Sequence, residues 1–204
     1  MNYIISAILG YLIGSVSFSY IISKSHGFDI RSKGSGNAGA SNITVTLGWK
    51  FGVLTALLDI FKGFAAFKLA QMLFPALPLA PYVAGCCAVL GHIFPFYMNF
   101  KGGKGFATYT GMILAIDWRI VVVIVIVSVI ITLVTNYIAL ATLTTAIGCP
   151  IYFWIAHYDP LIIAMFVVLM IVMIYKHWIN IQRIIKGEEI GLRKMKNHRV
   201  EKGV

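Results

Sequence analysis

Long apolar runs separated by short polar stretches make up most of this chain. Charged, glycine-rich or proline-containing segments interrupt the runs, which cover residues 3–23, 51–74, 79–98, 106–116, 120–156 and 161–175. A helix crosses the hydrocarbon core of a bilayer with about 20 apolar residues. The pattern therefore predicts a set of membrane-spanning helices.

Two of these runs need a separate interpretation. Residues 120–156 are far too long for one crossing at a rise of about 1.5 Å per residue, so this run must fold back. Thr135, Asn136 and Tyr137 form the predicted turn. Residues 106–116 are too short for a full crossing and predict a short helix shielded by its neighbours. The expected fold is an all-α polytopic membrane protein with seven transmembrane helices, one of them short.

The composition agrees with this pattern. Of 204 residues, 59% are hydrophobic and only 12% are charged, which is too apolar for an ordinary soluble domain. The first run has neither a basic segment before it nor a small-residue cleavage site, so we expect it to remain as the first helix. We interpret residues 1–204 as one transmembrane domain that ends in a basic tail from about residue 187.

The basic residues predict the orientation. With seven crossings, 14 of the 17 lysines and arginines lie on one side, against Arg119 opposite and Lys62 and Lys68 within the second run. Cytoplasmic loops are enriched in lysine and arginine, so this side is predicted to be cytoplasmic and the N-terminus to lie outside. The formal charge of +10 then reflects topology, and we expect no nucleic-acid partner. Five basic residues of the tail are expected to contact anionic lipid or to be solvated: Arg193, Lys194, Lys196, Arg199 and Lys202.

The three cysteines indicate neither a disulfide nor a metal site. Cys86, Cys87 and Cys149 all lie in apolar runs, and adjacent cysteines are poorly placed to bridge each other. No spacing such as C-x-x-C or H-E-x-x-H occurs in the chain. We expect small buried side chains at these positions, no metal and no cofactor.

The first polar loop, residues 34–42, is the first of three polar clusters on the predicted cytoplasmic side. Its sequence is Gly34-Ser35-Gly36-Asn37-Ala38-Gly39-Ala40-Ser41-Asn42. Small residues leave backbone N–H groups accessible, and Ser35, Asn37 and Asn42 offer neutral hydrogen bonds. An ordinary flexible loop is the alternative, because glycine, serine and asparagine are common in turns.

The glycine-lysine segment, Lys101-Gly102-Gly103-Lys104-Gly105, is the second cluster. Its glycines allow close approach of the backbone and its two lysines add positive charge, which together predict an anion-binding site. A helix that begins after the segment would add its dipole to this site. The G-x-x-x-x-G-K-[ST] pattern of a P-loop is absent, so nucleotide hydrolysis is not implied.

The third cluster lies at the end of the last apolar run. Lys176, His177, Asn180 and Arg183 share one helical face at three- and four-residue spacings. One helix would therefore present a base, an amide and cations together. The alternative is a basic helix end whose long side chains reach toward water.

Three further polar residues lie inside the apolar runs. Asp59 and Lys62 are three positions apart, and an unpaired charge is costly there, so we expect them to pair. His92 lies beside Gly91 and Pro95 at the inner end of its run. We expect it to support the glycine-lysine segment, although a ligand-binding role stays open.

Together these segments resemble the bacterial integral-membrane glycerol-3-phosphate acyltransferases that use acyl phosphate as donor. The resemblance rests on Gly14-Ser15-Val16, the first polar loop, Leu58-Asp59-Ile60-Phe61-Lys62-Gly63, residues 91–108, and His177-x-x-Asn180-Ile181-x-Arg183 with Gly187-x-Glu189. It spans nearly the whole chain. One such loop would be weak evidence, but three in the right order on the same predicted face are specific.

The resemblance implies a reaction and a location. A fatty acyl group passes from acyl phosphate to the sn-1 hydroxyl of glycerol 3-phosphate, which gives lysophosphatidic acid and inorganic phosphate in the first acylation of phospholipid synthesis. The enzyme would lie in the bacterial inner membrane as a multi-pass protein with its active site facing the cytoplasm. Its partners would be the two substrates and the bilayer, and the enzyme that makes acyl phosphate is a further candidate.

The resemblance also implies which residues form the site. The implied catalytic residues are Ser35, Asn37, Lys104, His177 and Asn180. The implied substrate- or phosphate-binding residues are Gly34, Gly36, Asn42, Lys101, Gly102, Gly103, Gly105, Thr108 and Arg183. The expected structural residues are Asp59, Lys62, His92 and Glu189, the last as a brace of the tail.

Two positions depart from the family pattern. Val45 stands where the family usually has an arginine, three residues after the final asparagine of the first loop, so Arg31, Lys33 or Lys50 would have to replace that cation unless it is missing. The residue before His177 is lysine where arginine is commoner, so a bidentate phosphate contact is less assured there.

Acyl phosphate already has a good leaving group, so we expect direct attack by the glycerol hydroxyl without an acyl-enzyme. The proton would pass to His177 or to a phosphate oxygen of a substrate, and the sequence leaves both options open.

Other function classes fit the sequence less well. A transporter of phosphate esters or other organic anions is the main alternative, but the polar groups gather on one predicted face and no inverted repeat is evident. An acyltransferase that uses acyl-CoA or acyl carrier protein would lead us to look for H-x-x-x-x-D, yet Tyr97 follows His92 and Gln182 follows His177 at that spacing. A phosphatidyl-transfer enzyme would need an aspartate-rich metal motif, and the chain has only 7 acidic residues.

Overall fold

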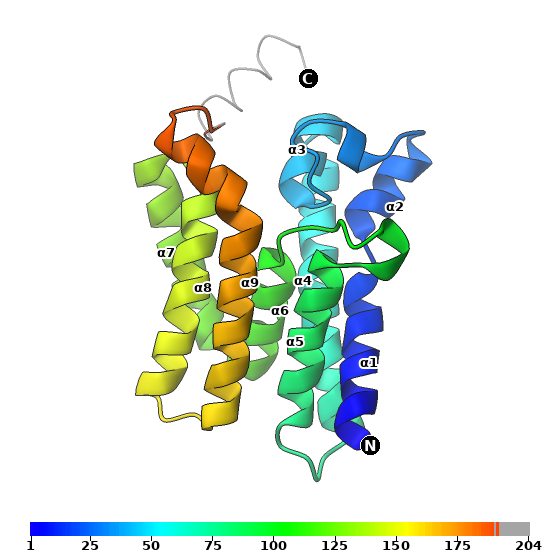
Figure 1. The fold of residues 1–204 in the computed structure, drawn as a ribbon, viewed down its shortest axis with the longest axis vertical. Helices are drawn as coiled ribbons and strands as arrows, with labels where there is room; N and C mark the ends of the chain where they lie inside the picture. The colour runs from blue at the N-terminus through cyan, green and yellow to red at the C-terminus, as the bar shows by residue number, and fades with distance from the viewer. Residues whose placement is uncertain (190, 192–204) are drawn as a thin grey trace. The chain divides into compact units, whose positions relative to one another are not determined.

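The computed structural model describes residues 1–189 and 191, and it contains helices and no strand in that part of the chain (Figure 1). The chain forms two compact units, Met1–Trp118 and a second that begins at Arg119. The single domain expected from the sequence stays a prediction, and each unit is described by itself. The basic tail residues Arg193, Lys194, Lys196, Arg199 and Lys202 lie outside the described residues.

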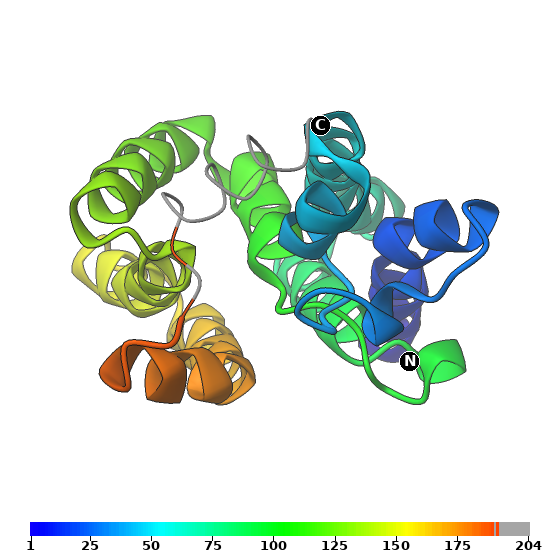
Figure 2. The same cartoon turned by 90° about the horizontal axis from the view of Figure 1, so that it is seen from above.

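Unit 1 contains six α-helices and two 3-10 helices. They are α1 (Asn2–Ser15), α2 (Phe18–Ser25), η1 (Ile30–Ser32), α3 (Ala40–Leu47), α4 (Trp49–Leu73), α5 (Ala80–Ile93), η2 (Phe96–Met98) and α6 (Phe106–Ile116). Helices α4 and α5 pack against each other and against both α1 and α6 (Figure 2). The predicted short helix at 106–116 is confirmed as α6.

Unit 2 contains α7 (Trp118–Thr135), α8 (Ile138–Ile155) and α9 (Pro160–Ile185). The predicted fold-back is confirmed, because the chain reverses at Asn136, which adopts a left-handed φ of 70°. Helix α9 starts at a proline with the Asp159 side chain accepting from Leu161 N at 2.7 Å, which caps its first turn. It runs ten residues beyond Tyr175, where the apolar run ends, so the third polar cluster is helical as predicted.

Five helical stretches are long and apolar enough to cross a membrane: Asn2–Ser25, Ala80–Met98, Trp118–Thr135, Ile138–Ile155 and Pro160–Ile185. Helix α4 has 25 residues, but Asp59, Lys62 and Lys68 place three charged side chains within it. Helix α6 is apolar but shorter. The described chain is thus all-helical with five candidate spans. Seven crossings would need α4 and α6 as well and stay a prediction.

Small residues bring α1 and α5 unusually close. Ser6, Gly10 and Gly14 follow each other at four-residue intervals on α1, and they face Ala80, Ala84 and Ala88 at the same interval on α5. Ser6 Oγ donates to Ala80 O at 2.6 Å, and a Cβ at Gly10 or Gly14 would overlap the carbonyl of Ala84 or Ala88. Such ladders are typical of helix contacts in membranes, where van der Waals packing drives association.

A second close contact joins α4 to α6. A Cβ at Gly63 would overlap Thr108 O, and one at Gly111 would overlap Ile60 O. Both glycines therefore allow the two backbones to touch. This contact fixes α6 against α4 and, with it, the position where α6 begins.

The first apolar run is not one continuous helix as predicted, because α1 and α2 are separated at Val16 and Ser17. Tyr97 Oη donates to Ser15 O and accepts from Ser17 N, both at 3.0 Å, while Lys62 Nζ donates to Val16 O at 2.7 Å. These side chains replace helical partners that the interruption removes, which is required where water is scarce.

The polar stretch between the first two apolar runs contains the helix α3, which begins inside the first polar loop at Ala40. The helix has an apolar side: Ile43 is fully buried with Ile30, Ala38 and Met98 in one hydrophobic cluster. Thr44 and Thr46 donate their hydroxyls to backbone oxygens one turn earlier at 2.9 and 2.8 Å. The loop is therefore anchored at both ends and is not simply flexible.

The α1–α5 ladder yields a stability prediction. Gly10→Ala forces the two backbones apart, and we expect it to lower the free energy of unfolding by about 1–3 kcal/mol, the usual cost of overpacking. Gly148→Ala on α8 is the matched control, because a Cβ there meets nothing within 4 Å and alanine favours the helix. Thermal unfolding in detergent is the measurement. Equal midpoints for the two variants would contradict the ladder.

Candidate functional site

Two of the three predicted polar clusters meet in unit 1. Arg31 Nη1 donates to Met98 O at 2.7 Å, which ties the residues before the first polar loop to those before the glycine-lysine segment. A Cβ at Gly103 would lie 2.9 Å from Ala38 O, so the loop and the segment also touch directly. The third cluster lies in unit 2 and is described below by itself.

Asn42 holds the first polar loop in shape. Its Nδ2 group lies 3.0 Å from each of Ile30 O, Lys33 O and Asn37 O, and its Oδ1 accepts from Ser35 N at 2.9 Å. The side chain is buried, so these bonds replace water. Asn42 thus shapes the loop through its amide, and its predicted role in binding substrate stays a prediction. Ser35 is exposed at the surface of this loop.

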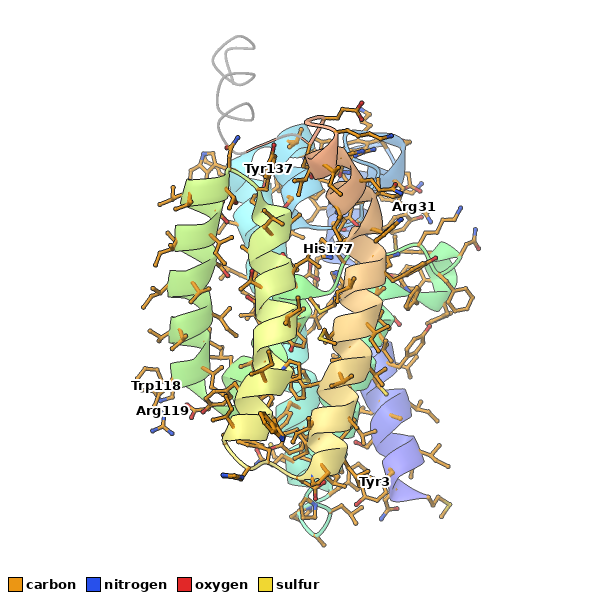
Figure 3. All side chains as sticks on the ribbon, turned by 60° about the vertical axis from the view of Figure 1, so that its left-hand side comes forward. Tyr3, Arg31, Trp118, Arg119, Tyr137 and His177 are labelled. Carbon is orange, nitrogen blue, oxygen red and sulfur yellow. The ribbon has the colours of Figure 1, made fainter. Side chains whose placement is uncertain are left out.

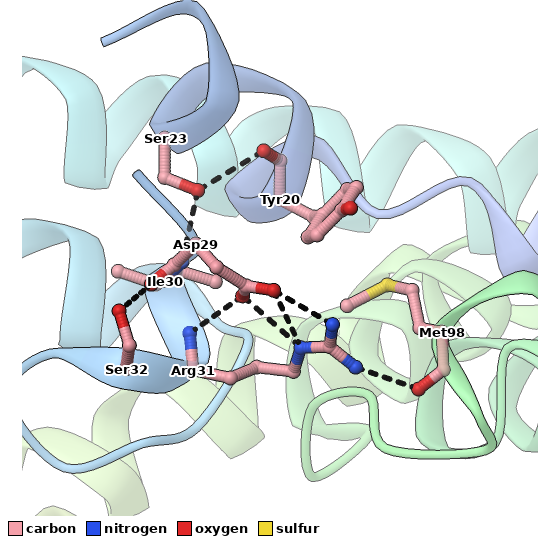
Figure 4. Close-up of polar contacts among 7 residues, drawn as sticks. All are labelled: Tyr20, Ser23, Asp29, Ile30, Arg31, Ser32 and Met98. Carbon is pink, nitrogen blue, oxygen red and sulfur yellow. Dashed lines mark hydrogen bonds and ion pairs between the residues drawn. The ribbon is translucent and has the colours of Figure 1, made fainter. Parts of the chain in front are cut away.

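Asp29 and Arg31 form a clamp beside the loop (Figure 4). Arg31 Nη2 lies 2.7 Å from Asp29 Oδ2, and Arg31 Nε donates to the same carboxylate at 3.0 and 3.2 Å. Hydrogen bonds from Arg31 hold the pKa of Asp29 below its ordinary value, since they favour the charged form. The clamp orients the guanidinium toward Met98 O. Sequence reasoning missed this role, and the Asp-x-Arg spacing alone does not reveal the distant carbonyl.

The glycines of the glycine-lysine segment pack against the end of α5. Gly102 N donates to Ile93 O and Gly103 N to His92 O, both at 3.1 Å. These N–H groups cap two of the carbonyls that a helix leaves open at its C-terminus. A Cβ at Gly102 or Gly103 would overlap His92, at its carbonyl oxygen or its ring Nε2 respectively. Their N–H groups are thus already bonded within the protein.

The N-terminus of α6 follows directly. Gly105 is its N-cap, with a φ of +91° that favours glycine, and a Cβ there would lie 2.9 Å from the Ile93 side chain. The first N–H groups of a helix have no partner within the helix and carry its positive dipole end. Thr108 in this first turn is fully buried, and its Oγ1 has no hydrogen-bond partner among the described residues. Lys104 is half-buried immediately before the turn, and Lys101 is exposed.

A buried ionic network lies behind the segment. The predicted Asp59–Lys62 pair is confirmed, with Lys62 Nζ 2.7 Å from Asp59 Oδ1 and side chains only 3% and 2% exposed. His92 joins it: its Nδ1 lies 2.9 Å from Lys62 Nζ and 3.5 Å from Asp59 Oδ1. His92 therefore contacts the ion pair with one ring nitrogen and faces Gly103 with the other.

The third cluster occupies the last turns of α9 in unit 2. His177 is buried, and its Nδ1 lies 2.8 Å from Met173 O. A carbonyl only accepts, so Nδ1 carries the proton and Nε2 is the acceptor of the neutral ring. Asn180 Nδ2 donates to Glu189 Oε1 at 2.6 Å. Glu189 thus contacts the helix end, and its predicted bracing role stays a prediction. The Arg183 side chain is exposed, and the Arg183 carbonyl accepts from Glu188 N at 2.8 Å.

Within each unit the predicted site residues lie toward one end. In unit 1, Tyr3 lies at the opposite end from Arg31 (Figure 3). In unit 2, Arg119 and Tyr137 mark the two ends, and His177 lies nearer the Tyr137 end (Figure 3). The cation at Arg119 is thus separated from the third cluster by most of the length of unit 2.

Comparison with known proteins assigns a family. A sequence model described as "Glycerol-3-phosphate acyltransferase" matches residues 4–187. Among curated relatives, "Glycerol-3-phosphate acyltransferase 1" of Oceanobacillus iheyensis is 39% identical, covering 96% of this chain and 97% of the relative. "Glycerol-3-phosphate acyltransferase" of Aquifex aeolicus is 36% identical, covering 93% and 98%.

Solved structures agree with the sequence comparison. The crystal structure of PlsY (YgiH), an integral membrane glycerol 3-phosphate acyltransferase, matches in its glycerol 3-phosphate form with a TM-score of 0.88 and 35% identity over 94% of this chain and 96% of that chain. Its lysophosphatidic acid form matches with a TM-score of 0.86 and 34% identity, covering 96% and 97%.

The Asp29–Arg31 clamp yields a pH-dependent prediction. Asp29→Asn removes the counter-charge of Arg31, and we expect a loss of about 1 kcal/mol at neutral pH, the scale of a charge-assisted bond at a partly exposed site. Because the folded pKa of Asp29 lies below the ordinary 3.8, its stabilisation is present above that value and is lost as pH falls through the folded value. The gap between wild type and variant should therefore close in acid.

Thermal unfolding of both proteins from neutral pH down to about pH 3 measures this gap. Glu188→Gln, at an exposed position in unit 2, is the control and should leave the midpoint unchanged. A gap that stays constant into acid would show that the carboxylate charge is not what holds the clamp.

Proposed function

The chain belongs to the glycerol-3-phosphate acyltransferase family, and from that membership we propose the donor, the site and the mechanism of its reaction. It acylates glycerol 3-phosphate and produces lysophosphatidic acid. The donor in our proposal is acyl phosphate, and the acceptor is the sn-1 hydroxyl. The related crystal structures, described as the glycerol 3-phosphate form and the lysophosphatidic acid form, support this choice of acceptor and product.

The single observation that carries the proposal is the arrangement at the start of α6 in unit 1, which we propose as the anion site. Helix α6 begins directly after the glycine-lysine segment, so its positive dipole end and Lys104 adjoin each other. Thr108 adds a buried hydroxyl to the same turn. Each substrate carries a phosphate group, and a site of this kind binds one without needing a metal ion.

The reaction balances without a covalent enzyme intermediate. The sn-1 oxygen of glycerol 3-phosphate forms a bond to the acyl carbon, and the bond from that carbon to the phosphate oxygen breaks. Inorganic phosphate leaves with the electron pair of that bond. The hydroxyl proton passes to His177 Nε2 or to a phosphate oxygen of a substrate. Helix dipole, lysine and amide groups stabilise the oxyanion that develops on the acyl carbonyl.

The site residues take the following roles in the proposal. Lys104 and the first turn of α6 bind phosphate, and Ser35 and Asn37 approach the reacting groups from the first polar loop. His177 has the tautomer that a general base requires. Glu189 fixes the orientation of the Asn180 amide, which supports an electrostatic role for Asn180 at the oxyanion.

Val45 narrows the source of the missing cation. Val45 is 56% exposed on α3, and because valine is apolar it supplies no positive charge at this position. Arg31 is held by Asp29 and Met98 O, so we assign the replacement to Lys33 or Lys50. Both are exposed, and Lys33 Nζ lies 4.1 Å from the centroid of the Phe28 ring.

The proposed topology has seven crossings with the basic ends in the cytoplasm. Besides the five long spans, α4 and α6 supply the other two crossings. Asp59 and Lys62 of α4 are buried within the protein as an ion pair, which lets a helix of lower hydropathy lie in lipid. We place the enzyme in the bacterial inner membrane with its site facing the cytoplasm, because Lys24, Lys33 and Lys101 are exposed near the site.

The donor assignment is tested with purified protein in lipid vesicles. Radiolabelled glycerol 3-phosphate is offered with acyl phosphate, acyl-CoA or acyl carrier protein in separate reactions, and we expect labelled lysophosphatidic acid only with acyl phosphate. Product from a thioester donor alone would overturn the donor assignment. Uptake of label without product would favour a transporter. Sealed vesicles of known orientation test the topology, since product should form only when glycerol 3-phosphate reaches the cytoplasmic side.

The base assignment is tested by His177→Gln, which keeps a side-chain donor near Met173 O. If His177 is the base, kcat should fall by about 10² to 10⁴ and its pH dependence should flatten. His26→Gln is the control, because His26 is exposed and its Nδ1 likewise lies near a carbonyl one turn earlier, Ile22 O at 2.8 Å. A variant that keeps nearly full kcat across the pH range would instead assign the proton to a substrate phosphate.

A further inference from the structure

The buried Asp59–Lys62–His92 network joins α4, α5 and the break between α1 and α2, and it contacts the glycine-lysine segment at Gly103. Asp59 and Lys62 belong to α4, His92 ends α5, and Lys62 reaches the break between α1 and α2. We propose that these three residues are positioning residues that fix the glycine-lysine segment for binding of glycerol 3-phosphate. The inference rests on the proposed function and adds a role that the reaction itself does not assign.

Lys62 is the centre of the network. Its Nζ lies 2.7 Å from Asp59 Oδ1, 2.7 Å from Val16 O and 2.9 Å from His92 Nδ1. A charged ammonium has three N–H donors and no acceptor, and here Val16 O and His92 Nδ1 are its hydrogen-bond partners while the Asp59 carboxylate supplies the counter-charge. His92 Nδ1 is therefore an acceptor in this arrangement, and the proton of the neutral ring is on Nε2.

His92 transmits this arrangement to the site. Its backbone oxygen accepts from Gly103 N at 3.1 Å, and its ring Nε2 faces the Cα of the same glycine, where a Cβ would overlap it. Ala38 O of the first polar loop lies 2.9 Å from the position that a Cβ of Gly103 would occupy. We infer that His92 sets the separation between the loop and the glycine-lysine segment, and α6 begins at Phe106, three residues after Gly103.

The energetics favour a positional role over a stabilising one. Removing charges from water costs several kcal/mol each, and apolar side chains of similar volume often stabilise a core equally well or better. An ionic network with a histidine does what apolar packing does not, because its hydrogen bonds have directions. Tyr97 adds to this geometry, since it bonds the chain at Ser15 and Ser17 on either side of the carbonyl that Lys62 binds.

A displaced segment should affect one substrate more than the other. The network lies behind the segment, so its loss moves Lys104 and the first turn of α6 without removing any group that contacts substrate. A misplacement on the scale of 1 Å is worth up to about 10²-fold in an enzyme. We expect the KM for glycerol 3-phosphate to rise at least about tenfold, with the KM for acyl phosphate changed less than about threefold.

The decisive variant is the double substitution Asp59→Asn with Lys62→Met. Lys62→Met alone leaves a buried carboxylate unpaired and is expected to destabilise the fold, whereas the double variant leaves no charge unpaired. We expect the double variant to recover the thermal midpoint but not the KM for glycerol 3-phosphate. His92→Phe is the second approach, because it keeps the ion pair and the ring volume but removes both ring nitrogens. Lys68→Met on the same helix is the control, since Lys68 Nζ donates to Gln71 Oε1 at 3.0 Å and lies 5.8 Å from the centroid of the Phe67 ring, and neither residue belongs to the network.

The outcomes separate the possibilities. The proposal would be overturned if the double variant recovered both the thermal midpoint and the wild-type KM for glycerol 3-phosphate. An equal rise in the KM for glycerol 3-phosphate and the KM for acyl phosphate would overturn it as well. If the double variant and His92→Phe both fail to fold, the network serves folding alone and the proposal is wrong. Failure of the proposed function would look different, because wild type and Lys68→Met would then form no lysophosphatidic acid from acyl phosphate.

Discussion

The need to satisfy a lysine ammonium inside the helices of unit 1 constrains everything around it. Lys62 has three acceptors, and they come from α4, α5 and the break between α1 and α2. Each acceptor must stay within hydrogen-bond distance, because an unpaired charge at this depth is costly. The helices that carry the acceptors are therefore held in one arrangement, and the polar segments that follow them start from fixed positions.

Short helices place these polar segments within the depth of a membrane. Helices α1 and α5 both have 14 residues, about 21 Å at 1.5 Å per residue, against a hydrocarbon core of roughly 30 Å. The regular helix is interrupted after each of them, at Val16 and Ser17 and again after Ile93, and interrupted backbone at such a depth must be bonded within the protein. Tyr97 and Lys62 bond the backbone of the first break, and Gly102 and Gly103 bond the end of α5. A recessed polar site is thereby compatible with lipid.

Sequence patterns predicted what depends on length, periodicity or local charge. The fold-back at Asn136 follows from the thickness of a membrane, and Asp59 and Lys62 pair because they are three residues apart on one helix. Contacts between residues 46 or more positions apart have no such signature. The bond of Lys62 to Val16 O and that of Tyr97 to Ser17 decide that the first run is broken. Ser6, Gly10 and Gly14 do carry a readable signal, a small residue at every fourth position, and it predicts close helix packing once it is looked for.

In the glycine-lysine segment, two glycines that the motif predicts as phosphate ligands also have a packing role in the structure. Glycine is read as a residue that lets a ligand approach the backbone, but at Gly102 and Gly103 the space of the missing side chain is taken by His92 and its neighbours. The N–H groups of these two glycines bond to carbonyl oxygens at the end of α5, and a contact of Gly102 or Gly103 with substrate stays a prediction. The close approach lets the chain turn back sharply after α5. Helix α6 then begins at Phe106, with Gly105 as its N-cap. In our proposal phosphate binds at Lys104 and the first turn of α6, and the glycines determine where that turn lies.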